Sequence, residues 1–258
     1  MAKRPSPASR TAPNERRQRL AEIQRQQKAR ERRSTLTIVG VCGALLVLLA
    51  GFITYGIIDA RRTAEANKPA NLILTLGAPA SAAACDPVTT DAAAGQGQHV
   101  GPGTDKPQQL KVDYATVPPS TGPHFAQPAV DGRGFYTAAD SPPVETLVHN
   151  LEHGYTVLWY LPSEEQAQGA TLRQVAEVGA RLDPSKGKLI VASWNDAYGA
   201  FPAGKKYALS HWSATQDAQG QIASQAGHRQ LCGALSGQAV LDFVTKYPST
   251  DSPEPRGA

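Results

Sequence analysis

An uncharged, apolar run of 23 residues at positions 36–58 constrains this chain more than any other feature of its sequence. As a helix with a rise of about 1.5 Å per residue it would be roughly 34 Å long, enough to cross a hydrocarbon core of about 30 Å. A core helix of a soluble protein would be shorter and would carry regularly spaced polar residues. We therefore predict one transmembrane helix over residues 36–58, which excludes a fully soluble protein.

Charge is distributed unevenly before and after this run. Residues 1–35 hold eleven Lys and Arg but three acidic residues, a net charge of +8, whereas the rest of the chain has a net charge of −4. By the positive-inside rule, residues 1–35 form a basic cytoplasmic tail, and the segment after the helix is extracytoplasmic. A cleaved signal peptide is the alternative, since Ala64-Glu65-Ala66 has the small-x-small pattern of a cleavage site. The long apolar run and long basic segment favour an uncleaved signal-anchor in the cell membrane.

The composition of the basic tail bears on its partners. The whole chain has a pI near 9.0, which suggests nucleic acid, but the tail contains no aromatic residue that would stack on a base. We predict contact with anionic lipid headgroups, worth about 1 kcal/mol per cation near the surface, and no nucleic acid. An envelope protein or a wall component is the expected partner of the extracytoplasmic domain.

The aromatic residues and the cysteines locate the folded domain. Fourteen of the sixteen aromatic residues lie from residue 85 onward, so residues 59–84 read as a linker and residues 85–258 as one domain. Within the linker, residues 71–77 are apolar enough for one short strand. Cys85 and Cys232 form an even pair in an oxidising compartment, and we predict a disulfide between them, with two buried free thiols as the alternative.

The pattern within residues 85–258 predicts an α+β domain. Residues 86–145 are rich in Gly and Pro and are expected to form ordered loops and short edge strands. Strands are then predicted at 155–161, 188–194 and 206–214, and two helices at about 163–182 and 236–247. This order indicates a small, mostly antiparallel sheet. We expect the tryptophans to be buried and His228 to be exposed.

The stretch Val148-His149-Asn150-Leu151-Glu152-His153-Gly154-Tyr155 is the most informative in the sequence. On a helical turn, His149 and His153 lie on the same side, as two ligands of one metal ion would. The stretch also fits H-x-x-E-H, in which two histidines bind zinc and the glutamate is a base. Gly154 and the strand after it leave no room for the long helix on which a metalloprotease carries that motif.

Two further histidines precede this stretch. His124 ends the segment Pro118-Pro119-Ser120-Thr121-Gly122-Pro123-His124, whose prolines restrict the backbone, and His99 lies in a Gly-rich loop. The candidate ligands are His124, His149 and His153, completed by Glu145, Glu152 or His99. Imidazole and carboxylate groups suit Zn²⁺ or Cu²⁺. The only methionine is Met1, which excludes a thioether Cu(I) site.

The two motifs, together with Gly134-Phe135-Tyr136, Glu145 and the closing Ser252-Pro253-Glu254, resemble a bacterial membrane-anchored family known as domain of unknown function 3105. The resemblance covers roughly residues 95–254, and the order Ser120-Thr121 inverts the usual Thr-Ser. It implies a fold and a topology but no established activity. It also marks His124, Glu145, His149, Glu152 and His153 as positions of the family motifs.

Three functions remain open on the sequence. The first is a His/Glu metal site in a membrane-anchored extracytoplasmic protein. The second is a non-catalytic envelope-binding or structural module, in which His149 and His153 belong to a hydrogen-bond network. The third is a metal-dependent hydrolase, which the absence of a G-x-S-x-G nucleophile motif disfavours. Residues 95–103 contain no GK[ST], so a phosphate-binding P-loop is not supported. Enzymatic activity stays open, with a non-enzyme favoured.

Overall fold

A computed structural model describes residues 12–129, 133–182 and 184–257. Contacts divide the chain into two compact units, Met1–Ala64 and Glu65–Ala258. Helix α1 (Ala12–Ala66) makes up the described part of the first unit and is long and apolar enough to cross a membrane. The first eleven residues of the basic tail lie outside the described residues.

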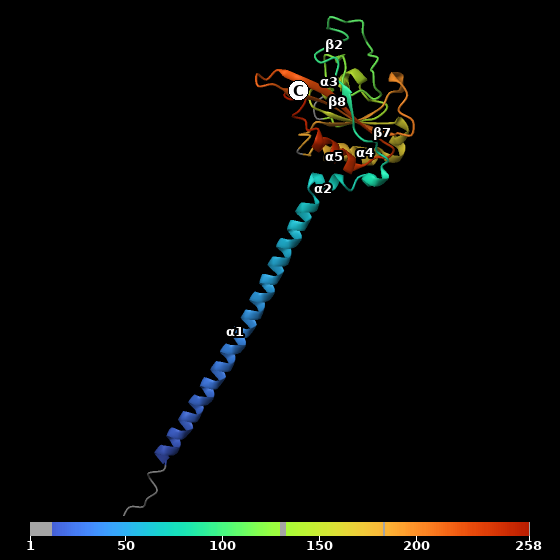
Figure 1. Ribbon diagram of the computed structural model, residues 1–258. Helices are drawn as coiled ribbons and strands as arrows, with labels where there is room; N and C mark the ends of the chain where they lie inside the picture. The colour runs from blue at the N-terminus through green and yellow to red at the C-terminus, as the bar shows by residue number, and fades with distance from the viewer. Residues whose placement is uncertain (1–11, 130–132, 183, 258) are drawn as a thin grey trace, which may run out of the picture. The chain divides into compact units, whose positions relative to one another are not determined.

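The second unit is built on a six-stranded sheet with the strand order β1-β8-β7-β5-β6-β4 (Figure 1). These strands are β1 (Thr89–Ala92), β8 (Ile222–Cys232), β7 (Tyr207–Gln216), β5 (Thr156–Tyr160), β6 (Leu189–Ser193) and β4 (Phe135–Tyr136). The pairings from β1 to β5 are antiparallel, whereas β6 is parallel to both β5 and β4. The α+β class is therefore confirmed, with a mixed sheet. A separate two-stranded parallel sheet joins β2 (His99–Val100) to β3 (His124–Phe125).

Helices cover both sides of the six-stranded sheet. They are α2 (Pro69–Ile73), α3 (Val144–Glu152), α4 (Glu165–Gly179) and α5 (Gly237–Lys246), with short 3₁₀ turns η2 (Ala80–Ala82), η3 (Pro162–Glu164) and η4 (Asp196–Tyr198). Helix α4 is the crossover that a parallel β5–β6 pair requires. Ser236 caps α5, since its Oγ accepts a hydrogen bond from the backbone N–H of Ala239. The sequence predicted α4, α5 and a helical turn at His149–His153, which is the end of the longer α3, whereas α2 is additional.

Side chains alternate across the sheet and form two cores. Helix α3 lies on one side of the sheet, and α4 and α5 lie on the other (Figure 1). Leu158, Tyr160 and Leu209 belong to the core on the α4 and α5 side, whereas Trp159 and Trp212 belong to the core on the α3 side. Strand β5 is buried along its whole length because both faces are covered. The predicted burial of the tryptophans at positions 159, 194 and 212 is confirmed.

The structure differs from the sequence expectations in three segments. Residues 222–232, which carry few large apolar side chains and lie outside the predicted strands and helices, form the long strand β8. Residues 69–73 of the expected linker are helical, and Ile73 is fully buried in the core of the second unit. His228 was expected to be exposed but is 8% exposed, because it stacks on Tyr247 with ring centroids 3.9 Å apart.

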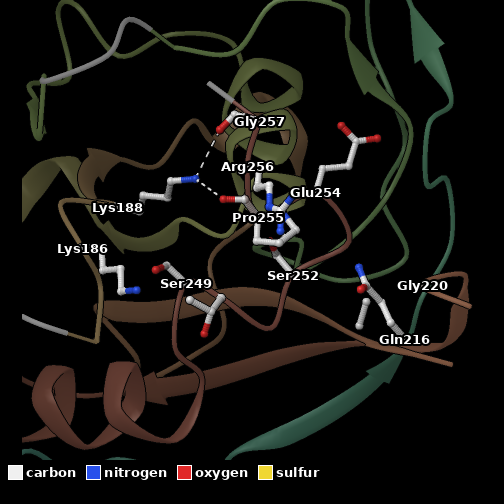
Figure 2. Close-up of a pocket in the computed structure, with 12 residues that line it drawn as sticks. Lys186, Lys188, Gln216, Gly220, Ser249, Ser252, Glu254, Pro255, Arg256 and Gly257 are labelled. Atoms are coloured by element: carbon white, nitrogen blue, oxygen red, sulfur yellow. Dashed lines mark hydrogen bonds between the residues drawn. The ribbon is translucent and has the colours of Figure 1, made fainter. Parts of the chain in front are cut away.

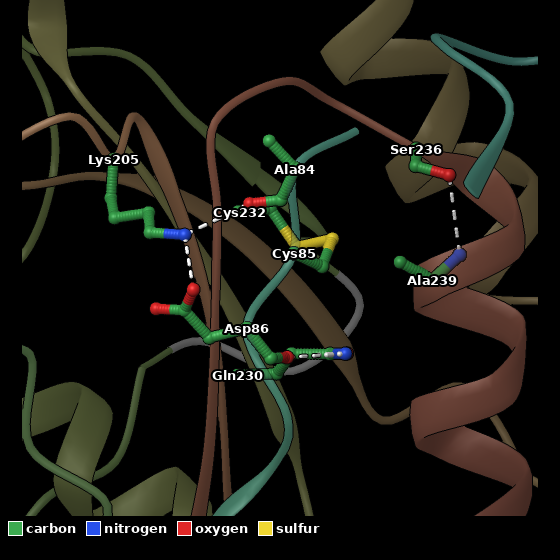
Figure 3. Close-up of a disulfide and its surroundings, with 8 residues drawn as sticks. All are labelled: Ala84, Cys85, Asp86, Lys205, Gln230, Cys232, Ser236 and Ala239. Carbon is green, nitrogen blue, oxygen red and sulfur yellow. Dashed lines mark hydrogen bonds and ion pairs between the residues drawn. A yellow bond between two sulfur atoms is a disulfide. The ribbon is translucent and has the colours of Figure 1, made fainter. Parts of the chain in front are cut away.

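The predicted disulfide is confirmed. Cys85 and Cys232 are bonded, with their Cα atoms 3.9 Å apart, and they tie the segment before β1 to the last residue of β8 (Figure 3). Polar contacts flank the bond, since Lys205 Nζ donates to the carbonyl of Ala84 and pairs with Asp86. The bridge closes a loop of 147 residues.

Candidate metal centre

Helix α3 positions the residues of the H-x-x-E-H stretch. His149 and Glu152 lie one turn apart and are both buried, whereas His153 is the C-cap residue. The helix ends there because Gly154 has φ +87°, and a Cβ at this position would overlap the carbonyl oxygen of Ser249. The glycine therefore fixes the point at which the chain leaves α3 for strand β5.

The two-stranded sheet brings in the other two histidines. His99 and His124 are register partners in the parallel β2–β3 pair, and the backbone N–H of His124 donates to the carbonyl of Gln98 at 3.1 Å. Partners in register point their side chains to the same face of a sheet. Residues 25 positions apart in the sequence thus lie side by side, with ring centroids 5.1 Å apart.

Four side chains converge where β2–β3 meets α3. His99, His124, His149 and Glu152 each offer one ligand atom, and these atoms all lie within 4.8 Å of one another. His99 is exposed, whereas the exposed fractions of His124, His149 and Glu152 are 0%, 5% and 1%. The cluster is therefore a mostly buried group with one side open to solvent.

Hydrogen bonds to the backbone orient two of the rings. His124 Nδ1 lies 2.8 Å from the carbonyl oxygen of Gly122, and His149 Nδ1 lies 2.6 Å from that of Phe125. A carbonyl only accepts, so each Nδ1 carries the proton and donates it. In the neutral ring the lone pair is then on Nε2, and ligand histidines in metalloproteins are commonly held in this way.

Glu152 faces these rings from the last turn of α3. Its Oε1 accepts a hydrogen bond from the backbone N–H of Gly97 at 2.7 Å, and its Oε2 lies 3.0 Å from His124 Nε2. The distance allows an ion pair, but within the described residues His124 Nε2 has no partner in hydrogen-bonding geometry. A buried nitrogen lone pair beside a carboxylate is an arrangement that a cation satisfies.

The protonation states also suit metal binding. The pKa of His149 is lowered to about 4, mainly by burial, with smaller contributions from the nearby His124 and His153 and with the bond to Phe125 opposing them. Burial raises the pKa of Glu152, but the contacts with His124 and Gly97 outweigh it and hold the pKa below its usual value. At neutral pH the group therefore presents a neutral imidazole at His149 and a carboxylate at Glu152, the forms that bind metal ions.

His153 lies at the edge of the cluster. Its Nε2 is 3.1 Å from His149 Nε2 and 3.3 Å from Glu254 Oε2. Glu152, His153 and Glu254 form a second group of potential ligands within 4.8 Å of one another. Sequence reasoning did not select Glu254 as a ligand, and its only signal was its place in the closing Ser-Pro-Glu segment.

Glu145 lies outside both groups. Its side chain is fully buried, and its two oxygens accept hydrogen bonds from the backbone N–H of Val112 at 2.7 Å and from the Tyr198 hydroxyl at 2.6 Å. It therefore ties α3 to the loop before β3 and to the turn η4. Of the six candidate ligands, the structure brings five together and gives Glu145 a different set of partners.

The family comparison covers most of the residues of this site. A family model described as a protein of unknown function (DUF3105) matches residues 105–258, which include His124, the whole of α3 and Glu254. His99 precedes the matched segment. No curated protein and no solved structure matches the chain significantly. Because the match spans more than half of the chain, this protein belongs to the DUF3105 family of proteins of unknown function.

Proposed function

We propose that this protein is a membrane-anchored extracytoplasmic metal-binding protein that holds Zn²⁺ or Cu²⁺. The ligands are His99, His124, His149 and Glu152. The observation that carries the proposal is the convergence of these four ligand atoms within 4.8 Å, with His124 and His149 each using Nδ1 on a backbone carbonyl. Both rings therefore keep Nε2 for an ion.

The size and chemistry of the group support one ion. Ligand bonds of about 2.0–2.1 Å place donor atoms roughly 3.3 Å apart as tetrahedral neighbours and about 4.1 Å apart on opposite sides of an ion. The observed spread requires small movements of the donors, and His99 is exposed and able to make one. Imidazole with carboxylate is a donor set of Zn²⁺ and Cu²⁺.

The topology belongs to the same proposal. Helix α1 supplies one candidate membrane span, and the eleven basic residues before its apolar run at 36–58 favour a cytoplasmic N-terminus. The bridge between Cys85 and Cys232 fits an oxidising compartment on the other side. Zinc or copper would then be bound outside the cytoplasm.

A structural hydrogen-bond network is the second candidate, and one contact favours it. His149 Nε2 lies 3.1 Å from His153 Nε2, within reach of a hydrogen bond that would occupy the lone pair of one ring. In that case the domain would be a non-catalytic envelope module. We do not propose hydrolysis, because Glu152 faces His124 and Gly97 as a ligand would, rather than standing apart as a base.

Metal content separates the two candidates. Full-length protein purified in detergent without chelators, loaded with Zn²⁺ or Cu²⁺ and then desalted, should retain at least about one equivalent by mass spectrometry. His149→Ala should lower the retained metal severalfold, and the control His211→Ala should not. Retention below about 0.2 equivalents of both metals by the unaltered protein would favour the structural network.

A further inference from the structure

We propose that the centre binds a second metal ion, held by His153 and Glu254, with Glu152 shared between the two ions. This inference rests on the proposed function, because the first ion occupies the group formed by His99, His124, His149 and Glu152. The result is a carboxylate-bridged dinuclear site. Its second ligand set comes from the end of α3 and the C-terminal segment.

The ligand geometry supports a shared carboxylate. Glu152 belongs to both ligand groups, and in each the ligand atoms lie within 4.8 Å of one another. A carboxylate has about four lone-pair sites on its two oxygens. The Gly97 N–H uses one of them on Oε1, and the others remain for two cations. Sharing also suits the charge, since two buried or half-buried carboxylates so close together are stabilised by cations.

The fold holds the C-terminal segment against α3. The backbone N–H of Glu254 donates to the carbonyl of Glu152 at 3.0 Å. Lys188 Nζ donates to the carbonyl of His153 at 2.8 Å and to that of Pro255 at 3.0 Å, which joins the two segments. Figure 2 shows the bond to Pro255. Gly257 packs on the ring of His153 so closely that a Cβ would overlap it. The position of Glu254 beside His153 is therefore set by several backbone contacts.

The second ion would be the solvent-exposed member of the pair. Glu254 has half of its side chain exposed and lines a cleft of about 1070 Å³, next to Pro255 and Arg256 (Figure 2). His124 and Glu152, by contrast, are almost completely buried. Two protein side chains and a shared carboxylate leave positions for water on the second ion, whereas the first ion has four protein ligands.

Copper titration of the full-length protein in detergent tests the second site. Cu²⁺ is the probe because it binds nitrogen and oxygen ligands most tightly among the first-row divalent ions. We expect two equivalents by equilibrium dialysis. We also expect the electron paramagnetic resonance signal to rise with the first equivalent and to weaken with the second, because bridged Cu²⁺ ions couple.

Variants assign each ion to its ligands. Glu254→Gln should retain one equivalent with an uncoupled signal, and the matched control Glu177→Gln, on the exposed side of α4, should retain two. Binding of a single equivalent by the unaltered protein overturns the second site and leaves the proposed function standing. Two equivalents without coupling, or with no loss in Glu254→Gln, also overturn it. Retention of no copper overturns this inference, and retention of neither copper nor zinc overturns the proposed function as well.

Discussion

Two groups of histidines lie on opposite faces of the same sheet. The adjacent β7 residues His211 and Trp212 point to these two opposite faces. Trp212 points toward the candidate metal centre, with its ring centroid 6.2 Å from that of His124. His211 points toward α5, and its ring centroid lies 6.2 Å from that of Tyr247. Both groups contain buried histidines next to a carboxylate, so residue type and burial alone do not distinguish them.

The group on the α5 side has its ring nitrogens bonded within the protein. His211 Nε2 lies 2.7 Å from Asp251 Oδ1, and its Nδ1 lies 3.2 Å from the carbonyl oxygen of Tyr155. His228 lies 2.7 Å from Ser213 Oγ through Nε2 and 3.4 Å from Thr90 Oγ1 through Nδ1. Each ring nitrogen of His211 and His228 thus has a partner within the protein, so these rings do not offer a nitrogen to a metal ion.

The contrast shows which property indicates a ligand site. On the α3 side, backbone carbonyls use one nitrogen of His124 and of His149, and the other nitrogens face Glu152 and neighbouring rings. On the α5 side, hydroxyl, carbonyl and carboxylate groups use both nitrogens. What matters is the bonding capacity that remains after the fold has formed.

Loss of a ligand should give the largest effect. We expect His124→Ala to lower the affinity for Cu²⁺ by at least about 100-fold, because it removes a fully buried donor from the centre of the group. His228→Ala, on the other face, should change the affinity by less than about twofold. Competition with a chromophoric chelator measures both. Equal losses in the two variants would contradict the distinction between the faces.

Removal of the disulfide should change the stability of the domain and leave its metal binding unchanged. Cys85→Ala combined with Cys232→Ala should lower the free energy of unfolding by about 2–5 kcal/mol, because the bridge closes a long loop. The copper affinity at the α3 side should stay the same. Urea unfolding of the metal-free protein measures the change, and a loss below about 1 kcal/mol would show that the bridge contributes little.

His211→Ala tests the structural role of the α5-side group. We expect a loss of about 3 kcal/mol in the free energy of unfolding, since the change opens a cavity and leaves Asp251 without its partner. Metal retention should be unaffected. Asp251→Asn is the matched control, because it keeps the contact and removes the charge, and it should cost less. If the folded His211→Ala protein also failed to bind metal, the two faces of the sheet would not have the separate roles described above.

Acid should destabilise both faces of the metal-free protein. Burial lowers the pKa of His149 and of His228 to about 4 from an ordinary value of 6.5. Between pH 6.5 and pH 4 the unfolded chain therefore binds more protons than the folded protein, and stability falls as the pH falls through this window. A shift of this size corresponds to at most about 3 kcal/mol for each histidine, and solvent screening reduces it to on the order of 2 kcal/mol.

Unfolding in urea at a series of pH values, with a chelator present, measures this dependence. His228→Gln should reduce the slope between pH 4 and pH 6.5 and leave the part due to His149. The same slope in His228→Gln and the unaltered protein would show that His228 does not titrate in this window.

Glu145→Gln should give the smallest effect. Glutamine keeps an acceptor for the N–H of Val112 but changes the bond to the Tyr198 hydroxyl, so we expect a loss of about 1 kcal/mol. The metal affinity should not change, whereas Glu152→Gln should lower it. Calorimetric titration with Cu²⁺ compares the two variants, and a weaker affinity in Glu145→Gln would return Glu145 to the site.

Local sequence patterns predicted part of the site. The spacing of His149, Glu152 and His153 predicted neighbours on one helical face, and α3 has that geometry because three to four residues make one turn. The same rule placed Glu145 one turn earlier, but its side chain bonds to Val112 and Tyr198 instead. A helical spacing fixes which residues share a face and does not fix which partners lie opposite that face.

The sequence by itself determined the long apolar helix, the α+β class and the pairing of the cysteines. These depend on composition and short-range pattern: 23 residues without charge, alternation in the strands, and two cysteines beyond the apolar run. Only the tertiary structure decided that His99 and Glu254 join α3 and that Glu145 does not. Those contacts join residues far apart in the sequence through the β2–β3 pairing and the return of the C-terminal segment, and a local pattern carries no information about such distances.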